Sequence, residues 1–132
     1  MLTCDTSGLV ALLVSGDRHH RAAVAMLRRD PGPYMVPVAI LAETTFVTER
    51  RGGATAVDAL LADLEHGAYT PDCGTSDWAR IRALVARYDD LPLGFADAAV
   101  IACAQRHGGV VLTLDRRDFD VVAADAGIRV VP

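Results

Sequence analysis

The chain has 132 residues and a formal net charge of -4, with 52% hydrophobic and 23% charged residues. This length suits one domain with one core, and no apolar run approaches the roughly 18 residues of a membrane span, so we expect a single domain over residues 1–132 and no membrane segment. All 13 basic residues are Arg, which excludes Walker-type phosphate loops and the usual phosphoaspartate enzymes, because both depend on a Lys. The acidic total also disfavours broad nucleic-acid binding and leaves only local or metal-assisted contacts.

The N-terminus and the cysteines indicate the compartment. The N-terminus lacks a basic region followed by an apolar signal core. Cys4, Cys73 and Cys103 are odd in number and show no metal-ligand spacing, so we expect reduced and mostly buried thiols rather than disulfides. Both features predict a cytoplasmic protein.

The first predicted strand ends on an acid. Residues 2–4 form a short strand candidate that runs into Asp5, Thr6 and Ser7, and an apolar helical face follows. All three polar residues are also common helix caps, and capping is the simplest interpretation of Ser7. A second helix is expected over residues 19–29.

A carboxylate lies on the apolar side of the next predicted helix. That helix covers residues 38–49, follows a strand candidate at residues 34–36 and closes at a glycine pair. Glu43 shares a face with Phe46 and other apolar residues, which predicts a buried carboxylate that must be paired or coordinated. The alternative is a Glu at the edge of this face, with its head in water.

The middle of the chain alternates between helices and strands. Helices predicted over residues 54–65 and 77–88 flank a strand candidate at residues 68–70, and the second helix is expected to bury Trp78 and Val85. Three of the predicted helices end at a glycine that an apolar run follows. This repeated junction predicts an α/β fold with a mostly parallel sheet.

The most apolar predicted helix contains a single charge. Between Leu93 and Gln105 the only charged residue is Asp97. A helix this apolar on all sides belongs at the centre of the domain, so Asp97 in its first turn is expected to be partly buried, with the helix dipole in its favour. An Asp in a first turn is also common without any catalytic role.

A second predicted strand ends on acids near the C-terminus. The apolar run at residues 110–113, with its β-branched Val and Thr residues, predicts a strand of a covered parallel sheet, and Asp115 and Asp118 follow it. Ligands gather at the carboxyl ends of such strands, although either Asp also suits a helix cap. A last helix and an edge strand at residues 128–131 complete the chain.

Four acids are expected to converge at one edge of the sheet: Asp5, Glu43, Asp97 and Asp115. Without any Lys they require cations, and oxygen ligands alone indicate Mg²⁺ or Mn²⁺. Carboxylate ligands leave coordination positions for water and phosphate oxygens, and a metal held in this way lowers the pKa of a bound water. The pattern is typical of metal-dependent nucleases.

With these motifs the chain resembles the PIN-domain nucleases, and within them the VapC-type toxins of bacterial toxin-antitoxin pairs. The resemblance covers essentially the whole chain and depends on Asp5-Thr6-Ser7, Glu43, residues 91–98 and residues 112–119. It implies a PIN-like three-layer α/β fold, in which helices flank a mostly parallel five-stranded sheet.

The resemblance also implies roles for individual residues. The four acids become the catalytic residues and the metal ligands. Thr113 is expected to supply a hydroxyl that orients a carboxylate or a water. Asp118 is an optional further ligand, because its position varies among family members.

Substrate contacts are expected at Thr6 and Ser7 and at the basic pair Arg116 and Arg117. The two arginines directly follow Asp115, and an acidic protein needs local positive charge to accept a polyanion. A salt bridge or a solvated first turn is the alternative for both arginines.

The implied function is a Mg²⁺- or Mn²⁺-dependent endoribonuclease toxin that hydrolyses structured RNA, such as tRNA or ribosomal RNA, and leaves 3′-hydroxyl and 5′-phosphate ends. A cognate VapB-type antitoxin would neutralise the toxin, and a homodimer is expected. The apolar content is high for one small sheet, which predicts that part of it forms an exposed groove for such a partner or for self-association. The residues concerned are Leu9, Leu12, Leu13, Val24 and Leu27 of the first two helices, together with Phe46 and Val47. The alternative is that they are simply core. Two alternatives stay open: a catalytically silent PIN-like module that binds protein or RNA, and a DNA or nucleotide phosphohydrolase that uses the same acids.

Overall fold

Six helices and five strands alternate along the chain in the computed structural model, which describes all 132 residues. The strands are β1 Leu2–Cys4, β2 Tyr34–Pro37, β3 Thr70–Asp72, β4 Val110–Leu112 and β5 Arg129–Val131. The helices are α1 Thr6–Leu13, α2 His20–Arg29, α3 Leu41–Glu65, α4 Trp78–Arg87, α5 Phe95–Arg106 and α6 Arg116–Ala126, and a 3₁₀ turn at Val38–Ile40 precedes α3.

The strands form one parallel sheet in the order β3-β2-β1-β4-β5. This arrangement confirms the predicted five-stranded parallel sheet. The chain moves outward from β1 through β2 to β3, then returns to the other side of β1 with β4 and β5. The carboxyl ends of β1 and β4, where Cys4 pairs with Leu112, therefore form the topological switch point at which ligands bind in open α/β sheets.

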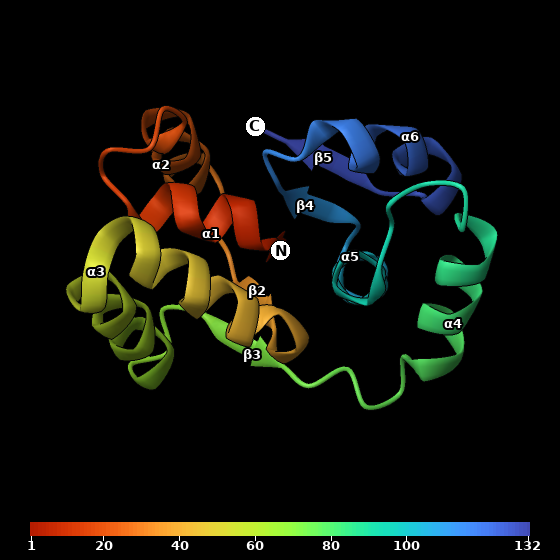
Figure 1. The fold of residues 1–132 in the computed structure, drawn as a ribbon, viewed down its shortest axis with the longest axis horizontal. Helices are drawn as coiled ribbons and strands as arrows, with labels where there is room; N and C mark the ends of the chain where they lie inside the picture. Colours follow the sequence, from red (N-terminus) through yellow and green to blue (C-terminus); the bar gives the residue numbers. More distant parts are fainter.

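Helices cover both faces of the sheet. Because crossovers between parallel strands are right-handed, the two opposite directions of travel place α1–α3 on one face and α4–α6 on the other. Figure 1 shows these groups to the left and right of the sheet, with α4 outside α5. Every residue from Ala98 to Ala104 of α5 is buried, as expected for a helix whose only charge before Gln105 is Asp97. No helix is both long enough and apolar enough to cross a membrane.

The helix α3 consists of two limbs. Its backbone is helical on both sides of Gly53, where φ is 75° and ψ is -179°. This left-handed backbone favours glycine, and it separates the two helices that the sequence predicts there. The first limb carries Glu43, and the direction of the second limb follows from the kink.

Several expected positions were wrong. The third strand covers Thr70–Asp72 instead of residues 68–70, because the N–H groups of Ala68 and Tyr69 still donate to the carbonyl of Asp63 at the end of α3. Trp78 is 59% exposed and Val85 is 38% exposed. Only the side of α4 with Ile81 and Leu84 is buried. The apolar residues of this helix therefore cover a wider face than the one that packs against the core.

Candidate active site

Four acids from different parts of the chain line one cleft of about 640 Å³ at the switch point. Asp5 directly follows β1, and Asp115 lies in the segment after β4, which ends at Leu112. Glu43 lies in the first turn of α3, and Asp97 in the first turn of α5. The acidic cleft thus receives one carboxylate from each helical layer and two from the sheet edge.

The four carboxylates differ in exposure. Asp5 is buried, with 6% of its surface exposed. Asp97 is partly buried, whereas Glu43 and Asp115 are exposed. The expectation that Glu43 is buried was wrong, because the first turn of α3 faces the open cleft rather than the core.

Crowding of negative charge changes the acidity of the cleft. Burial raises the pKa of Asp97 to about 6, and the charges of Asp5, Asp115, Asp118 and Glu43 act in the same direction. Burial also raises the pKa of Asp115, together with the charges of Asp118 and Asp5. A bound cation would relieve this repulsion, because it favours the ionised form of each acid.

Two hydroxyl groups hold the deepest acid in place. The Oδ2 atom of Asp5 accepts hydrogen bonds from Ser7 Oγ at 2.9 Å and Thr113 Oγ1 at 2.8 Å. These hydroxyls in turn accept from the backbone N–H groups of Leu114 at 2.9 Å and Asp115 at 3.1 Å. Both hydroxyl groups thus donate their proton to Asp5 Oδ2. The other oxygen, Oδ1, is left for another ligand.

The expected substrate residues divide into two sets. Thr6 and Ser7 line the acidic cleft, and Thr6 Oγ1 lies 3.1 Å from Thr44 Oγ1 of α3. Arg116 and Arg117 do not line it. Arg116 instead forms a salt bridge with Asp120 at 3.0 Å and donates to the carbonyl of Pro132 at 2.9 Å. For Arg116 this agrees with the alternative to substrate binding, a salt bridge in the first turn of the helix.

Asp118 lies behind the cleft rather than on its wall. Its side chain is buried in the first turn of α6, and its charge contributes to the raised pKa values of Asp97 and Asp115. Asp118 therefore affects the cleft through its charge, and a direct role as a ligand stays a prediction.

Sequence reasoning missed the basic residues of the cleft. Arg18, His19 and Arg51 line it, as does Asp17, which pairs with Arg51 at 2.7 Å. Hydrogen bonds from the His19 N–H and from Arg51 hold the pKa of Asp17 below its usual value, although burial opposes this shift. No local pattern places these residues beside the acids, because the contact depends on how α2 and α3 pack.

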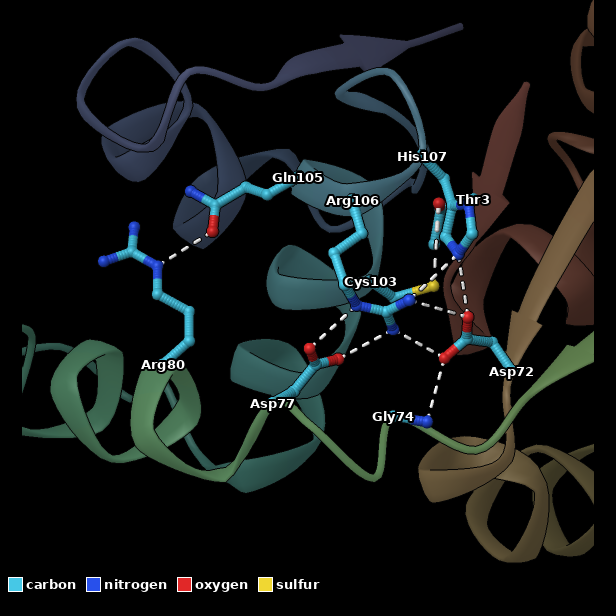
Figure 2. Close-up of polar contacts among 9 residues, drawn as sticks. All are labelled: Thr3, Asp72, Gly74, Asp77, Arg80, Cys103, Gln105, Arg106 and His107. Carbon is cyan, nitrogen blue, oxygen red and sulfur yellow. Dashed lines mark hydrogen bonds and ion pairs between the residues drawn. The ribbon is translucent and has the colours of Figure 1, made fainter.

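A second polar cluster lies beside α5 (Figure 2). Asp72, Cys103 and His107 bring one potential metal ligand each within 4.8 Å of one another. The oxygens of Asp72, however, already accept from Arg106 at 2.6 and 3.1 Å and from His107 Nε2 at 2.8 Å. Arg106 also contacts both oxygens of Asp77, each at 2.8 Å.

This second cluster does not suit a metal as well as the acidic cleft does. The hydrogen bonds from Arg106 are the main reason that the pKa of Asp72 falls to about 2. A fixed guanidinium repels a further cation, so we interpret the cluster as a link between β3 and α5. The four carboxylates of the acidic cleft and the hydroxyls beside them, in contrast, form a donor set that fits Mg²⁺ or Mn²⁺.

The fold and the acidic cleft together define a class of protein, and comparisons with known proteins agree. The family model of the PIN domain matches residues 2–125, which is nearly the whole chain. The chain therefore belongs to the PIN-domain family.

Individual relatives extend this assignment. Ribonuclease VapC26 of Mycobacterium tuberculosis is 31% identical over 127 residues, which cover 95% of this chain and 94% of that protein. The crystal structure of M. tuberculosis VapC20, described as a toxin that cleaves the sarcin-ricin loop, matches with a TM-score of 0.82 at 25% identity, over 92% of this chain and 95% of that one. A toxin-antitoxin complex from Klebsiella pneumoniae shares the fold, with a TM-score of 0.70 at 22% identity over 100% and 97% of the two chains.

Proposed function

We propose that this protein is a metal-dependent endoribonuclease toxin of a toxin-antitoxin pair, formed by one nuclease domain over residues 1–132. The observation that supports the proposal is the convergence of Asp5, Glu43, Asp97 and Asp115 at the switch point. A relative described as a ribonuclease matches this chain in sequence, and a toxin described as cleaving the sarcin-ricin loop shares its fold, each over most of its length. Cellular RNA as the substrate implies action in the cytoplasm.

The residues of the acidic cleft have different roles in the proposed reaction. The four acids would hold Mg²⁺ or Mn²⁺, which when bound supplies an activated water and positive charge for the phosphate. Ser7 and Thr113 keep Asp5 in one orientation. Thr6 lies on the cleft wall, where its hydroxyl can donate to a phosphate oxygen. Hydrolysis at the phosphodiester then leaves 3′-hydroxyl and 5′-phosphate ends.

Two other functions use the same fold. A silent module that only binds RNA or protein would not need repelling charges at its cleft, because uncompensated buried carboxylates cost stability. The raised pKa of Asp97, caused by burial and neighbouring acids, argues against that function. A DNA or nucleotide phosphohydrolase uses the same acids, and only the choice of substrate separates it from a ribonuclease.

The decisive experiment compares the cleavage of cellular RNA by wild type and by Asp97→Asn. We expect Mg²⁺- or Mn²⁺-dependent cleavage at a defined RNA site, reduced at least about 100-fold in the variant, since even outer contacts of metal ligands are worth 10–100-fold. Asp89→Asn is the matched control, because Asp89 is an exposed acid in the loop before α5. Full activity of Asp97→Asn, or activity in excess chelator, would contradict the proposal.

We further propose that an antitoxin covers a hollow on the outer side of α3. Phe46 and Leu61, which are 59% and 51% exposed, line it together with Val57. An apolar groove across two helical limbs suits the apolar face of a partner helix. Phe46→Glu should abolish co-purification with the product of the neighbouring reading frame. Val121→Glu, at an exposed position of α6, should not.

We also propose that the protein forms a homodimer, and an exposed aromatic pair at the starts of α4 and α5 supports this proposal. The rings of Trp78 and Phe95 stack with centroids 6.3 Å apart and are 59% and 48% exposed. Exposed aromatic pairs of this kind are typical of interfaces. Sedimentation should show a dimer that Trp78→Glu dissociates; a monomeric wild type would contradict self-association.

A further inference from the structure

The helix α2 and the turn before it carry an isolated run of positive charge. Residues 18–29 include four arginines and no acid, in a protein whose formal net charge is -4. These residues are Arg18, Arg21, Arg28 and Arg29, and we call them the basic stripe. Nothing in the catalytic proposal uses them beyond the position of Arg18 at the cleft.

The packing of α2 turns the arginines away from the core. Ala23 is fully buried, and Met26 and Leu27 pack against the core cluster. The other side of the helix, with Arg21, Arg28 and Arg29, lines a shallow hollow of about 440 Å³. The helix is ten residues long, which corresponds to a charged surface of about 15 Å.

The basic stripe has no internal counter-charge. Arg51, Arg87, Arg106 and Arg116 each pair with an aspartate. None of the four arginines of the stripe forms an ion pair. Arg18 donates from Nε to His19 Nε2 at 2.9 Å, which is not a counter-charge. All four guanidinium groups therefore lack a negative partner that a ligand could supply.

The stripe begins at the acidic cleft. Arg18 and His19 line that cleft and directly precede α2. Their turn is fixed, because Asp17 accepts from the His19 N–H at 2.7 Å and pairs with Arg51 of α3 at 2.7 Å. Figure 1 shows α2 at the outer border of the molecule, beyond α1. Because Arg18 directly precedes α2 and Arg21, Arg28 and Arg29 are exposed, a ligand that leaves the cleft past Arg18 meets these arginines.

We propose that the basic stripe is the RNA-backbone subsite of this protein and binds phosphates of the strand that leaves the acidic cleft. The inference rests on the proposed ribonuclease function. A polyanion that approaches five acids of the cleft wall needs compensating cations beyond the metal. Arg is suited to this task, because its planar fork binds phosphate through two hydrogen bonds.

The test measures binding of a fluorescein-labelled single-stranded RNA of mixed sequence by anisotropy, across a series of salt concentrations and in the presence of chelator. The double variant Arg28→Ala/Arg29→Ala should bind on the order of tenfold more weakly, with a salt slope flatter by roughly 1.4, since each lost phosphate contact removes about 0.7 for a single strand. Arg28→Lys/Arg29→Lys should restore the slope. Melting curves identify any variant that fails to fold.

Arg82→Ala/Arg129→Ala is the matched control, because both arginines are exposed, form no ion pair and lie on other elements. An unchanged salt slope of RNA binding in Arg28→Ala/Arg29→Ala would overturn the inference. An equal loss of affinity in the control would also overturn it, because the effect would then depend only on the net charge of the protein. Loss of binding to a polyglutamate peptide or to the antitoxin, with RNA binding intact, would assign the stripe to a protein and also overturn it. Chelator prevents metal-dependent cleavage, so this result is independent of the nuclease assay that tests the proposed function.

Discussion

Two side-chain hydrogen bonds fix the orientation in which Asp5, the most buried acid of the cleft, meets a ligand. Asp5 is buried, and both of its side-chain hydrogen bonds end on Oδ2. A carboxylate held through one oxygen offers the other in a defined direction. Outer contacts of this kind typically change metal affinity or activity by 10–100-fold.

We therefore expect Ser7→Ala to weaken Mn²⁺ binding by roughly tenfold or more, because Asp5 loses one donor and the Leu114 N–H loses its acceptor. Thr113→Val, which keeps the shape of the side chain, should have an effect of similar size. Calorimetric titration with Mn²⁺ measures both. Ser7→Thr keeps the hydroxyl and serves as the control; Mn²⁺ affinity of Ser7→Ala equal to that of wild type would show that the hydroxyl acts on substrate alone.

At the scale of elements, the contact of α1 with β4 sets the distance between two acids of the cleft. A Cβ atom at Gly8 would lie 2.5 Å from the carbonyl oxygen of Leu112 and 2.9 Å from its side chain. Neither the backbone of β4 nor a fully buried Leu can move freely. Glycine at position 8 thus permits the close packing that brings Asp5 near Asp115.

Gly8→Ala should destabilise the protein by about 1–3 kcal/mol, the usual cost of inserting a methyl group into a packed core. Urea unfolding measures this change. The residual folded protein should also bind Mn²⁺ more weakly, because α1 must move relative to β4. Gly16→Ala, where a Cβ meets no atom within 4 Å, is the control, and equal stability of the two variants would contradict the close contact.

The link between β3 and α5 gives stability a dependence on pH. Hydrogen bonds from Arg106 lower the pKa of Asp72 to about 2. The ionised Asp72 therefore stabilises the fold fully above its unfolded-state pKa near 4, and this stabilisation is lost as the pH falls toward 2. A shift of this size corresponds to at most about 2.5 kcal/mol, and solvent around the partly exposed Arg106 reduces it to on the order of 1 kcal/mol.

Asp72→Asn should consequently lower the free energy of unfolding by about 1 kcal/mol at neutral pH and by roughly half as much at pH 3. Urea titrations of wild type and variant at both pH values provide the comparison. Asp89→Asn again serves as the control. A difference that grows on acidification would contradict the sign of this linkage.

For the whole molecule, the acidic cleft makes stability depend on metal. Four carboxylates that repel one another destabilise the metal-free fold, and a cation that binds only the folded state stabilises it by mass action, by about 2.7 kcal/mol at 100 times its Kd. The Tm of wild type should therefore rise by on the order of 10 °C in saturating Mn²⁺.

Asp97→Asn should melt at a higher temperature than wild type without metal, because one repelling charge is gone, and should gain less from Mn²⁺. Differential scanning fluorimetry with and without Mn²⁺ tests both points, with the chloride concentration held constant. A Tm of wild type that millimolar Mn²⁺ leaves unchanged would argue against a preformed metal site.

Much of this protein follows from local sequence patterns. The alternation of helices and strands, the central position of α5 and the acids at the ends of β1 and β4 all follow from periodicity and from residue type. Those patterns report on neighbours in the chain, because a hydrophobic stripe or a glycine cap acts within a few residues. The family motifs add the expectation that the four acids meet.

The tertiary structure decided what depends on distant segments. The strand order and the handedness of the crossovers bring Glu43 and Asp97 from opposite faces to one cleft, and the open side of that cleft leaves Glu43 exposed. The same packing directs Thr113 onto Asp5, and it places Arg18 rather than Arg116 on the cleft wall. Such contacts join residues that no periodicity relates, since their approach is fixed only when the helices pack on the sheet.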